Sequence, residues 1–341
     1  MAERIAIVTP VLDDWVSFAG LVTEISARFA GSDFVFDICA VDDGSAEPFD
    51  ADGIVLPRGS CVGSIEIIRL AANLGHQRAI AIGLCAVAEG GAADVVVVMD
   101  SDGQDRPADI AALLAANHRQ PQHVVFAGRA RRSEPRTFRV WYRLYQLLFY
   151  ALTGRAINFG NYCAIPMAGV CRLVHMPELW NNLAASVMRS RLPYMSVPTV
   201  RGSRCAGRSQ MNLVALIVHG LSAMSVYADK ILIRILLAAG LVAGFALLAI
   251  LAVAAIRVAT DLAIPGWATT AIGDLLIILL QTFVIVIAAS LTVLAGRSNR
   301  PILPIVDCRS FVAGRDCFIA AYEDCRLGRA RPAVAAVRPA A

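Results

Sequence analysis

Two long apolar stretches in the C-terminal half constrain the fold of this chain more than any other feature. Residues 235–256 and 275–295 contain no charged side chain. As an α-helix, each stretch would extend for roughly 30 Å, which is the thickness of the hydrocarbon core of a bilayer. Buried helices of a soluble domain are the alternative, but both stretches are long for such helices and neither has a polar face. The sequence therefore predicts two transmembrane helices.

The composition agrees with this prediction. The chain of 341 residues is 57% hydrophobic and only 17% charged, whereas about 25% of the residues in soluble domains are charged. Its mean hydropathy is +0.61. The formal net charge of +4 is modest and no block of basic residues occurs, so we do not expect nucleic acid as a partner.

The charges beside the apolar stretches predict their orientation. Lys230 and Arg234 precede the first stretch, and Arg297 and Arg300 follow the second, whereas the connection at 257–274 carries one arginine and two aspartates. Because cytoplasmic loops are enriched in lysine and arginine, both ends of this hairpin should be cytosolic. The N-terminus has no signal-peptide pattern. We therefore expect a protein of the cytoplasmic (inner) membrane with two spans, whose N-terminal domain and both termini are cytosolic.

The N-terminal part alternates between strand-like and helix-like segments. Short runs of β-branched residues are separated by stretches with helical periodicity. This alternation predicts an α/β domain with an open, mostly parallel, Rossmann-like sheet and helices on both faces. The expected strands are Ile5–Val8, Phe34–Val41, Ile65–Leu70, Val95–Met99 and Val124–Ala127, and the expected helices are Trp15–Phe29, Gln77–Glu89 and Pro107–Asn117.

Two further helices are expected beside the membrane. Arg136–Leu152 combines aromatic residues and arginines at helical spacing, which is typical of an interfacial helix lying on a membrane. A helix packed on the domain core fits this pattern equally well. Met211–Tyr227 is also apolar but is shorter than a span, so we interpret it as a second juxtamembrane helix.

Polar residues and glycines follow all five expected strands, at the edge of the sheet where α/β proteins bind ligands. The fourth strand is the most informative, because Asp100 and Asp102 follow it at alternate positions. In extended geometry both carboxylates point to one face. Such oxygen ligands suit Mg²⁺ or Mn²⁺ held against a phosphate. An ordinary solvated acidic turn is the alternative interpretation of this pair alone.

Six motifs occur in a fixed order along the chain: Val8–Asp14, Val41–Ser45, Asn73–Gln77, Asp100–Pro107, Gly128-Arg129 and Arg204–Gln210. In this order, and followed by two spans, they resemble the family 2 glycosyltransferases of GT-A fold. The similarity is closest to the membrane-anchored polyprenyl-phosphate (dolichol-phosphate-type) members and covers roughly residues 4–295.

The resemblance implies a role for each matched residue. The base and ribose of a sugar nucleotide would be framed by Pro10, Leu12, Asp14, Val41 and Asp43. The metal or its bound phosphates would be held by Asp100, Asp102 and Gln104. The diphosphate or the acceptor phosphate would be met by Arg129, Arg204 and Gln210. The implied catalytic set is Asp100, Asp102, Arg129 and Arg204.

The chain departs from the family pattern at four positions. Leu12 replaces the usual tyrosine and Asp14 the usual glutamate in the opening motif. Gln210 stands where the family usually has a lysine, although Arg208 is close by in the sequence. Asn161 lies in a segment that is acidic in close relatives, and an asparagine cannot act as a base. His76, in the third motif, is expected to stabilise a turn or cap a helix, with a phosphate contact as the alternative.

The implied reaction is an inverting transfer from a UDP- or GDP-sugar to a polyprenyl phosphate, with Mg²⁺ or Mn²⁺. A lipid phosphate is largely anionic at pH 7, since its second pKa is about 6, so it needs little help from a general base. A neutral lipid hydroxyl as acceptor is the main alternative and would need a base, for which Asp94 and Asp105 are candidates. A processive polysaccharide synthase is disfavoured, because neither a Gln-x-x-Arg-Trp motif nor a larger membrane bundle is present. A non-catalytic scaffold is disfavoured by the intact Asp100, Asp102 and Gln104.

These inferences predict six segments, and a homo-oligomer is compatible with them. They are a nucleotide-sugar-binding core at 1–135, an acceptor-side part with interfacial helices at 136–230, a first span at 231–256, an extracytoplasmic hairpin at 257–274, a second span at 275–296 and a cytoplasmic tail at 297–341. The sequence of the tail shows no motif that we can interpret.

Overall fold

The structure, a computed structural model, describes most of the chain. The described residues are 2–50, 54, 56, 60–129, 136–155, 160–202, 204, 220–260, 266–298, 301–319 and 335–337. The chain divides into two compact units. The first unit comprises residues 1–143, 157–226 and 302–341, and the second comprises residues 144–156 and 227–301.

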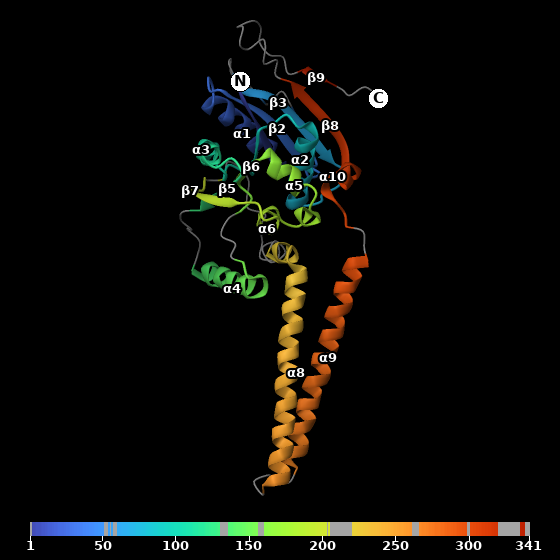
Figure 1. The fold of residues 1–341 in the computed structure, drawn as a ribbon. Coiled ribbons are helices and arrows are strands. Elements are labelled where there is room, and N and C mark those ends of the chain that lie inside the picture. The colour runs from blue at the N-terminus through green and yellow to red at the C-terminus, as the bar shows by residue number, and fades with distance from the viewer. Residues whose placement is uncertain are drawn as a thin grey trace. The chain divides into compact units, whose positions relative to one another are not determined.

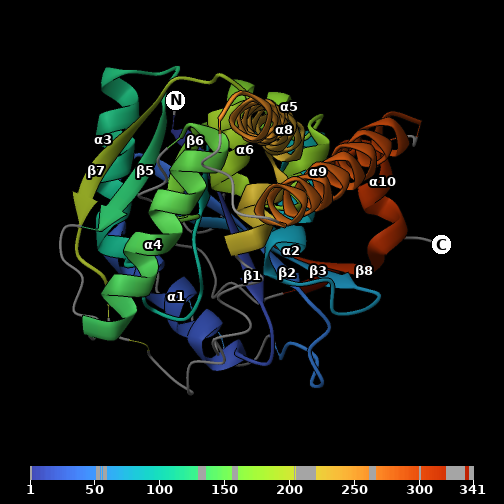
Figure 2. The same cartoon turned by 90° about the horizontal axis from the view of Figure 1, so that it is seen from below.

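Within the described residues, the first unit is built on a nine-stranded sheet in the order β7-β5-β6-β4-β1-β2-β3-β8-β9. Figure 2 shows β1, β2, β3 and β8 following one another across this sheet, and Figure 1 shows its helices. The strands are β1 (Glu3–Val11), β2 (Phe34–Asp42), β3 (Val62–Leu70), β4 (Val95–Val98), β5 (Val124–Arg129), β6 (Cys163–Pro166), β7 (Tyr194–Thr199), β8 (Val312–Ile319) and β9 (Ala335–Val337).

The pairing of the central strands creates the place for a ligand. β1 pairs in parallel with β2 on one side and with β4 on the other, and β2 pairs in parallel with β3. The strand order therefore reverses at β1, and open α/β sheets bind their ligands in the crevice at such a reversal, beyond the carboxyl ends of the strands. β6 interrupts the parallel arrangement because it runs antiparallel to both β4 and β5.

Helices cover both faces of the sheet, and the side chains of the strands alternate between these faces. In β1, Ile5 and Ile7 pack in one buried cluster with α1 and α3, whereas Ala6 and Val8 pack in a second cluster with α2, α5 and α6. The helices of this unit are α1 (Trp15–Arg28), α2 (His76–Gly90), α3 (Ile110–Arg119), α5 (Met167–Leu173), α6 (Leu183–Arg189) and α10 (Pro304–Asp307), with short 3-10 turns at Pro107–Asp109, Pro177–Trp180 and Cys308–Phe311.

The predicted mostly parallel α/β sheet is confirmed, and its GT-A arrangement is followed by two long apolar helices. All five expected strands and all three expected helices of the N-terminal part are present. The boundaries differ by a few residues, as for β3, which begins at Val62 rather than Ile65. The antiparallel strands β6 and β8 and the parallel edge strand β7 were not predicted.

The chain returns to the first unit after the apolar helices. β8 runs antiparallel to β3 and pairs Phe318 with Ile65. The guanidinium of Arg315 in β8 lies 3.7 Å from the carboxylates of both Glu66 and Glu89. The indole N–H of Trp180 donates to the carbonyl of Ile302 at 3.1 Å. The residues that directly follow the second apolar stretch are thus an integral part of the sheet domain.

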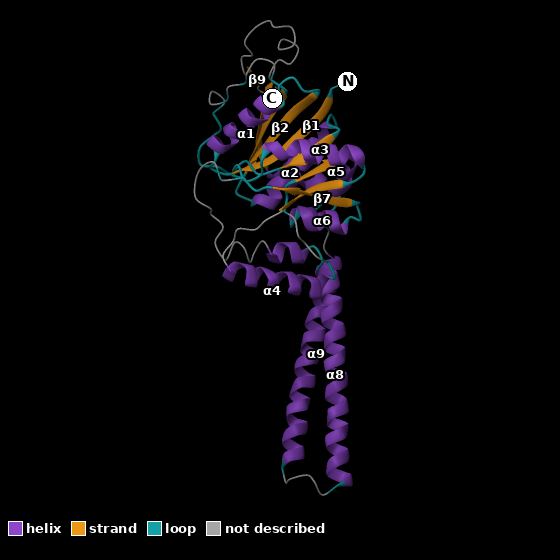
Figure 3. Ribbon diagram, turned by 90° about the vertical axis from the view of Figure 1, so that its left-hand side faces the viewer, coloured by secondary structure: helices purple, strands orange, loops and turns teal. Residues whose placement is uncertain are grey.

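The second unit is a hairpin of two long helices, α8 (Ala228–Ala259) and α9 (Trp267–Ser298), which lie side by side (Figure 3). Small side chains such as Ala239 and Ala246 are buried between neighbours, whereas Leu241 is 66% and Phe245 is 71% exposed. Both helices are long and apolar enough to cross a membrane. The contact between the two helices covers only a small part of their apolar surface.

The end of α4 (Arg136–Thr153) belongs to this second unit. Arg234 of α8 donates to the carbonyl of Tyr150 at 3.4 Å and also to that of Ala151. Gly154 follows with a φ of +72° and donates its N–H to the Tyr150 carbonyl at 2.8 Å, which is a left-handed helix C-cap. The helix expected at 136–152 is therefore present, and a cation from α8 satisfies its last carbonyls.

Candidate active site

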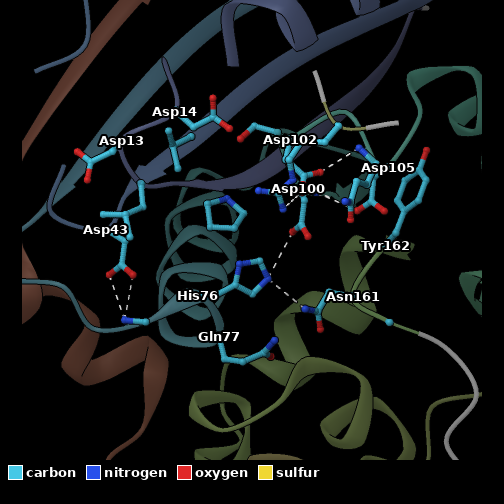
Figure 4. Close-up of a pocket in the computed structure, with 18 of the residues that line it drawn as sticks. Asp13, Asp14, Asp43, His76, Gln77, Asp100, Asp102, Asp105, Asn161 and Tyr162 are labelled. Atoms are coloured by element: carbon cyan, nitrogen blue, oxygen red, sulfur yellow. Dashed lines mark hydrogen bonds and ion pairs between the residues drawn. The ribbon is translucent and has the colours of Figure 1, made fainter. Parts of the chain in front are cut away.

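A cleft of about 1430 Å³ lies at the carboxyl ends of the central strands. The loops that follow β1, β2, β3, β4 and β7 all contribute to its lining. Figure 4 shows that His76 faces both Asp100 and Asn161 there. The parallel pairing of β2, β1 and β4 brings these loops to one edge of the sheet, so the convergence expected from the sequence is present.

Asp100 and Asp102 line this cleft in a tightly folded loop after β4. The backbone N–H of Asp100 donates to Oδ2 of Asp105 at 3.0 Å. The backbone N–H of Gln104 donates to Oδ1 of Asp102 at 2.9 Å. Gly103 between them has a φ of +84°, a conformation that costs glycine little. The loop is thus held by its own carboxylates, and this fixes where they can point.

The segment after β7 closes onto this loop. Nη2 of Arg204 donates to Oδ2 of Asp102 at 2.8 Å, and the guanidinium of Arg201 donates to Oε1 of Gln104. The N–H of Gly202 donates to the carbonyl of Gln104 at 2.9 Å. A Cβ at Gly202 would collide with the carbonyl oxygen of Gly103. Arg201 and Arg204 therefore form one compact polar group with the carboxylate of Asp102 and the amide of Gln104.

His76 is the first residue of α2, and its ring faces the loop after β4 (Figure 4). Its Nε2 lies 3.4 Å from Oδ1 of Asp100 and accepts from Nδ2 of Asn161 at 3.2 Å. Desolvation lowers the pKa of His76, an effect that nearby carboxylates such as Asp105 partly offset. Gly75 rather than His76 takes the N-cap position of α2.

Asp43 is 4% exposed and supports the neighbouring loop. Its Oδ1 accepts the backbone N–H of Leu74 at 2.7 Å, and its Oδ2 accepts that of Gly75 at 2.9 Å. Burial raises the pKa of Asp43, and these two hydrogen bonds oppose the shift. The carboxylate thus fixes the path of the chain immediately before His76.

The loops after β1 and β2 are joined by Asp13. Its Oδ1 accepts the backbone N–H of Ala46 at 2.7 Å, and its own N–H donates to Oγ of Ser45 at 2.9 Å. Asp13 has a φ of +50°, which is uncommon for a residue other than glycine. Next to it, Asp14 is the N-cap of α1 and accepts from the N–H of Ser17 at 3.3 Å. These contacts shape the end of the cleft near Pro10 and Leu12.

The structure brings most of the predicted site residues together. The predicted residues that line the cleft are Pro10, Leu12, Asp14, Asp43, Asp100, Asp102, Gln104 and Arg204. Val41 does not reach the cleft, because its side chain is fully buried in the core beside α2. Arg129 ends β5, but its side chain lies outside the described part of the chain, as does the whole of Gln210.

Several contributing residues were not identified from the sequence as parts of this site. Arg201 lies in no recognised motif, and Asp13 lies within the Val8–Asp14 motif but was given no role, because each acts through a loop conformation. The hydroxyl of the buried Tyr162 donates to the carbonyl of Arg106 at 2.8 Å and so ties β6 to the loop after β4. Asp94, one of the two candidate bases, precedes β4 and accepts the N–H of Arg4 at 2.9 Å. It therefore lies at the opposite end of the strand from Asp100.

Comparison with protein families identifies the class of this chain. Residues 6–176 match the model of glycosyl transferase family 2, which covers half of the chain. The chain belongs to this family, and glycosyl transfer is therefore its class of activity. No curated protein sequence matches the chain significantly.

Two solved structures illustrate the likeness to known folds. Mannosyl-3-phosphoglycerate synthase from Rubrobacter xylanophilus shares 15% identity at a TM-score of 0.46, over 67% of this chain and 74% of that one. Glucosyl-3-phosphoglycerate synthase from Mycobacterium tuberculosis, solved with Mn²⁺, UDP-glucose and phosphoglyceric acid, shares 14% identity at a TM-score of 0.45, over 67% of this chain and 80% of that one. At these values the likeness decides nothing about substrate.

Proposed function

We propose that this protein is an inverting, metal-dependent glycosyltransferase that moves a sugar from a UDP- or GDP-sugar to a polyprenyl phosphate at the cytoplasmic face of a membrane. One observation carries the proposal. The carboxylates Asp100 and Asp102 and the guanidinium of Arg204 share one edge of the cleft, in a chain that also has two helices apolar enough to cross a membrane.

The chemistry of the cleft suits Mg²⁺ or Mn²⁺. Among the described residues, no three His, Cys, Asp or Glu side chains lie close enough to hold a metal by themselves. Mg²⁺ is usually bound by one or two carboxylates, with water and substrate phosphates completing its shell. Asp100 and Asp102 supply two such carboxylates, and Gln104 is beside them. When bound there, the metal would supply positive charge against the donor diphosphate.

The arginines of the cleft supply the remaining positive charge. Arg201 and Arg204 both line the cleft beside the loop after β4. A leaving nucleoside diphosphate gains negative charge as the sugar–oxygen bond breaks, and fixed cations stabilise that charge. A phosphate acceptor adds further charge, which would be repelled by the donor without such cations. Two guanidinium groups at one end of the cleft therefore suit a reaction between two phosphate-bearing substrates.

The acceptor assignment rests on which groups face the reacting region. Asn161 and His76 contact each other there, and neither is a carboxylate. Asp105 lines the cleft, but its Oδ2 accepts the N–H of Asp100. A phosphate monoester is mostly ionised at pH 7 because its second pKa is about 6, so it can attack without losing a proton to the protein. This favours a lipid phosphate over a lipid alcohol.

The location beside a membrane is supported by the connectivity. The chain leaves the first unit near Val226 and rejoins it at Ile302, with α8 and α9 between. If the two helices cross a bilayer, both of their outer ends must lie on the same side as the sheet domain. The enrichment of Lys and Arg at those ends supports a cytosolic location for that side.

One observation favours a second candidate, transfer to the hydroxyl of a neutral membrane lipid. The imidazole of His76 lines the cleft beside Asp100, and an imidazole in its neutral form could accept the proton of a hydroxyl. In this alternative, His76→Ala should abolish transfer. With a phosphate acceptor it should weaken transfer without abolishing it.

The test uses membranes that contain the protein. They are incubated with Mn²⁺, added polyprenyl phosphate and each of a panel of labelled UDP- and GDP-sugars, and the lipids are then extracted. We expect one donor to give a labelled lipid that mild acid hydrolyses, and Asp102→Ala to abolish it. Labelling of a neutral, acid-stable lipid instead would contradict the acceptor. Failure of every donor in the panel would contradict the activity itself.

A further inference from the structure

Both carboxylate oxygens of Asp102 already have partners within the chain. Oδ1 accepts the backbone N–H of Gln104 at 2.9 Å, and Oδ2 accepts Nη2 of Arg204 at 2.8 Å. The side chains of Asp102 and Arg204 are only 17% and 29% exposed. The ion pair is therefore shielded from water on most sides, and a charge-assisted hydrogen bond of this length is a strong one.

The proposed function asks the same oxygen to serve a divalent metal. The hydrogen bond from the Gln104 N–H to Oδ1 is part of the turn and is kept as long as the loop keeps its shape. Oδ2 is therefore the oxygen that could exchange Arg204 for a metal. A guanidinium and a dication on one carboxylate oxygen would repel each other at a few ångströms, where screening is weak. Arg204 and the metal therefore compete for Asp102.

We infer that Arg204 is an internal counter-ion that a divalent cation must displace from Asp102, and that the displaced guanidinium then binds substrate phosphate. This inference rests on the proposed function, because it takes Asp102 as a metal ligand. Arginine suits both states, since its planar fork of donors matches a carboxylate and a phosphate equally well. The charge on Asp102 is thus neutralised in both states of the cleft.

This arrangement has opposite consequences for catalysis and for the binding of the metal alone. Removing Arg204 should weaken catalysis, because a phosphate ligand is lost. The same change should strengthen binding of the metal alone, because its competitor is lost. An arginine that lay too far from Asp102 to compete with the metal would leave the affinity for free Mn²⁺ unchanged.

The experiment measures Mn²⁺ binding to the full-length protein in detergent or nanodiscs, without nucleotide, from the electron paramagnetic resonance signal of free Mn²⁺. Four proteins are compared: wild type, Arg204→Gln, Asp102→Asn and Arg172→Gln. Arg172 is an exposed residue of α5 outside the cleft, so its variant controls for the loss of one positive charge. We expect Arg204→Gln to bind Mn²⁺ about three- to tenfold more tightly than wild type, and Arg172→Gln to match wild type.

The outcomes separate this inference from the proposed function. If Asp102→Asn loses Mn²⁺ binding while Arg204→Gln binds no more tightly than wild type, the exchange is refuted and the metal site stands. If Asp102→Asn binds Mn²⁺ as wild type does, the metal assignment itself fails, and the exchange fails with it.

A second measurement needs no variant, in case Arg204→Gln does not fold. Wild-type protein is treated with phenylglyoxal, which modifies accessible arginines, and labelling of Arg204 is quantified by mass spectrometry. Saturating Mn²⁺ should raise this labelling at least about twofold because the ion pair with Asp102 is broken, and inorganic diphosphate added with Mn²⁺ should reduce it again. If Mn²⁺ left the labelling of Arg204 unchanged or lowered it, the inference would be overturned.

Discussion

The carboxylate of Asp105 accepts the backbone N–H of Asp100 at 3.0 Å. This hydrogen bond closes the loop after β4 and holds Asp100 at the carboxyl end of the strand. Asp105 was considered from the sequence as a base for a hydroxyl acceptor. Its contact with Asp100 indicates a positioning role instead, because the carboxylate is already committed to the loop that carries the proposed metal ligands.

Replacing Asp105 should therefore impair metal use more than donor binding. We expect Asp105→Ala to lower kcat/KM by about tenfold, since small displacements of catalytic groups are costly, and to raise the Mn²⁺ concentration required for half-maximal activity. Asp105→Asn keeps an oxygen acceptor for the Asp100 N–H and should retain more activity. The check is a Mn²⁺ titration of transfer for both variants. Equal and complete inactivation of both would indicate that Asp105 is a base after all.

Gly202 provides a second test of the same loop. A Cβ there would lie 3.0 Å from Cγ of Arg106 and closer still to the carbonyl of Gly103. We expect Gly202→Ala to push the segment after β7 away from the loop after β4. The rate of transfer should fall by at least about tenfold, and the free energy of unfolding by about 1–3 kcal/mol.

Gly20 is the matched control for this substitution. It lies in α1, and a Cβ there would have no atom within 4 Å. Gly20→Ala should raise the free energy of unfolding by about 0.5–1 kcal/mol, because alanine is the better helix former, and leave the transfer rate unchanged. Denaturant unfolding and steady-state rates measured on both variants distinguish the two cases. A Gly202→Ala protein with wild-type activity would contradict the close packing described for the site.

The returning strand β8 should contribute to stability through Arg315, which faces both Glu66 and Glu89. We expect Arg315→Ala to lower the free energy of unfolding by about 1 kcal/mol, at the upper end for partly exposed ion pairs. Arg69 pairs across the same two strands with Asp316, but both side chains are more than 40% exposed. Arg69→Ala should therefore cost only a few tenths of a kcal/mol.

The effect of Arg315→Ala should depend on pH. Burial raises the pKa of Glu66, while Arg315 lowers it and Glu89 raises it, so removing Arg315 raises the pKa of Glu66 further. When the pKa of a carboxyl group is higher in the folded state than in the unfolded state, the protein loses stability as the pH rises through the folded-state pKa. The free energy of unfolding of the variant should thus be closest to that of wild type below pH 4.5, the ordinary glutamate pKa. The difference in this free energy should widen toward neutral pH. A gap that is constant between pH 4 and pH 7 would show that Glu66 does not sense Arg315.

The central parallel strands could be predicted from the sequence because they contain short runs rich in β-branched residues. β4 is a run of four valines and is fully buried, and such uninterrupted β-branched runs are typical of central parallel strands. β8 escaped prediction because it interrupts its apolar residues with Arg315 and Asp316. Its place in the sheet depends on pairing with β3, which is far away in the sequence. The local pattern of apolar residues does not indicate such a pairing.

For the candidate site, too, the location could be predicted from the sequence but the long-range contacts could not. Asp100 and Asp102 follow a recognisable strand, so their location could be inferred from the rule that α/β sheets bind ligands at the carboxyl ends. The contacts of Arg204 with Asp102 and of Arg201 with Gln104 could not be inferred, since they depend on how the segment after β7 folds over the loop. The side chain of Val41 is buried in the core, and a motif match does not say which face of a strand a side chain occupies.

The proposed function depends most directly on the acceptor being a lipid phosphate. The decisive measurement places polyprenyl phosphate and the polyprenol of the same chain length together in one vesicle, with the active sugar nucleotide, Mn²⁺ and the purified protein. Because the two lipids differ only in the phosphate, the ratio of their glycosylated products by mass spectrometry reports the acceptor. We predict that nearly all of the transferred sugar is found on the phosphate, and that none is transferred by Asp102→Asn. Sugar on the polyprenol, in an amount equal to or greater than that on the phosphate, would contradict a lipid phosphate as the acceptor.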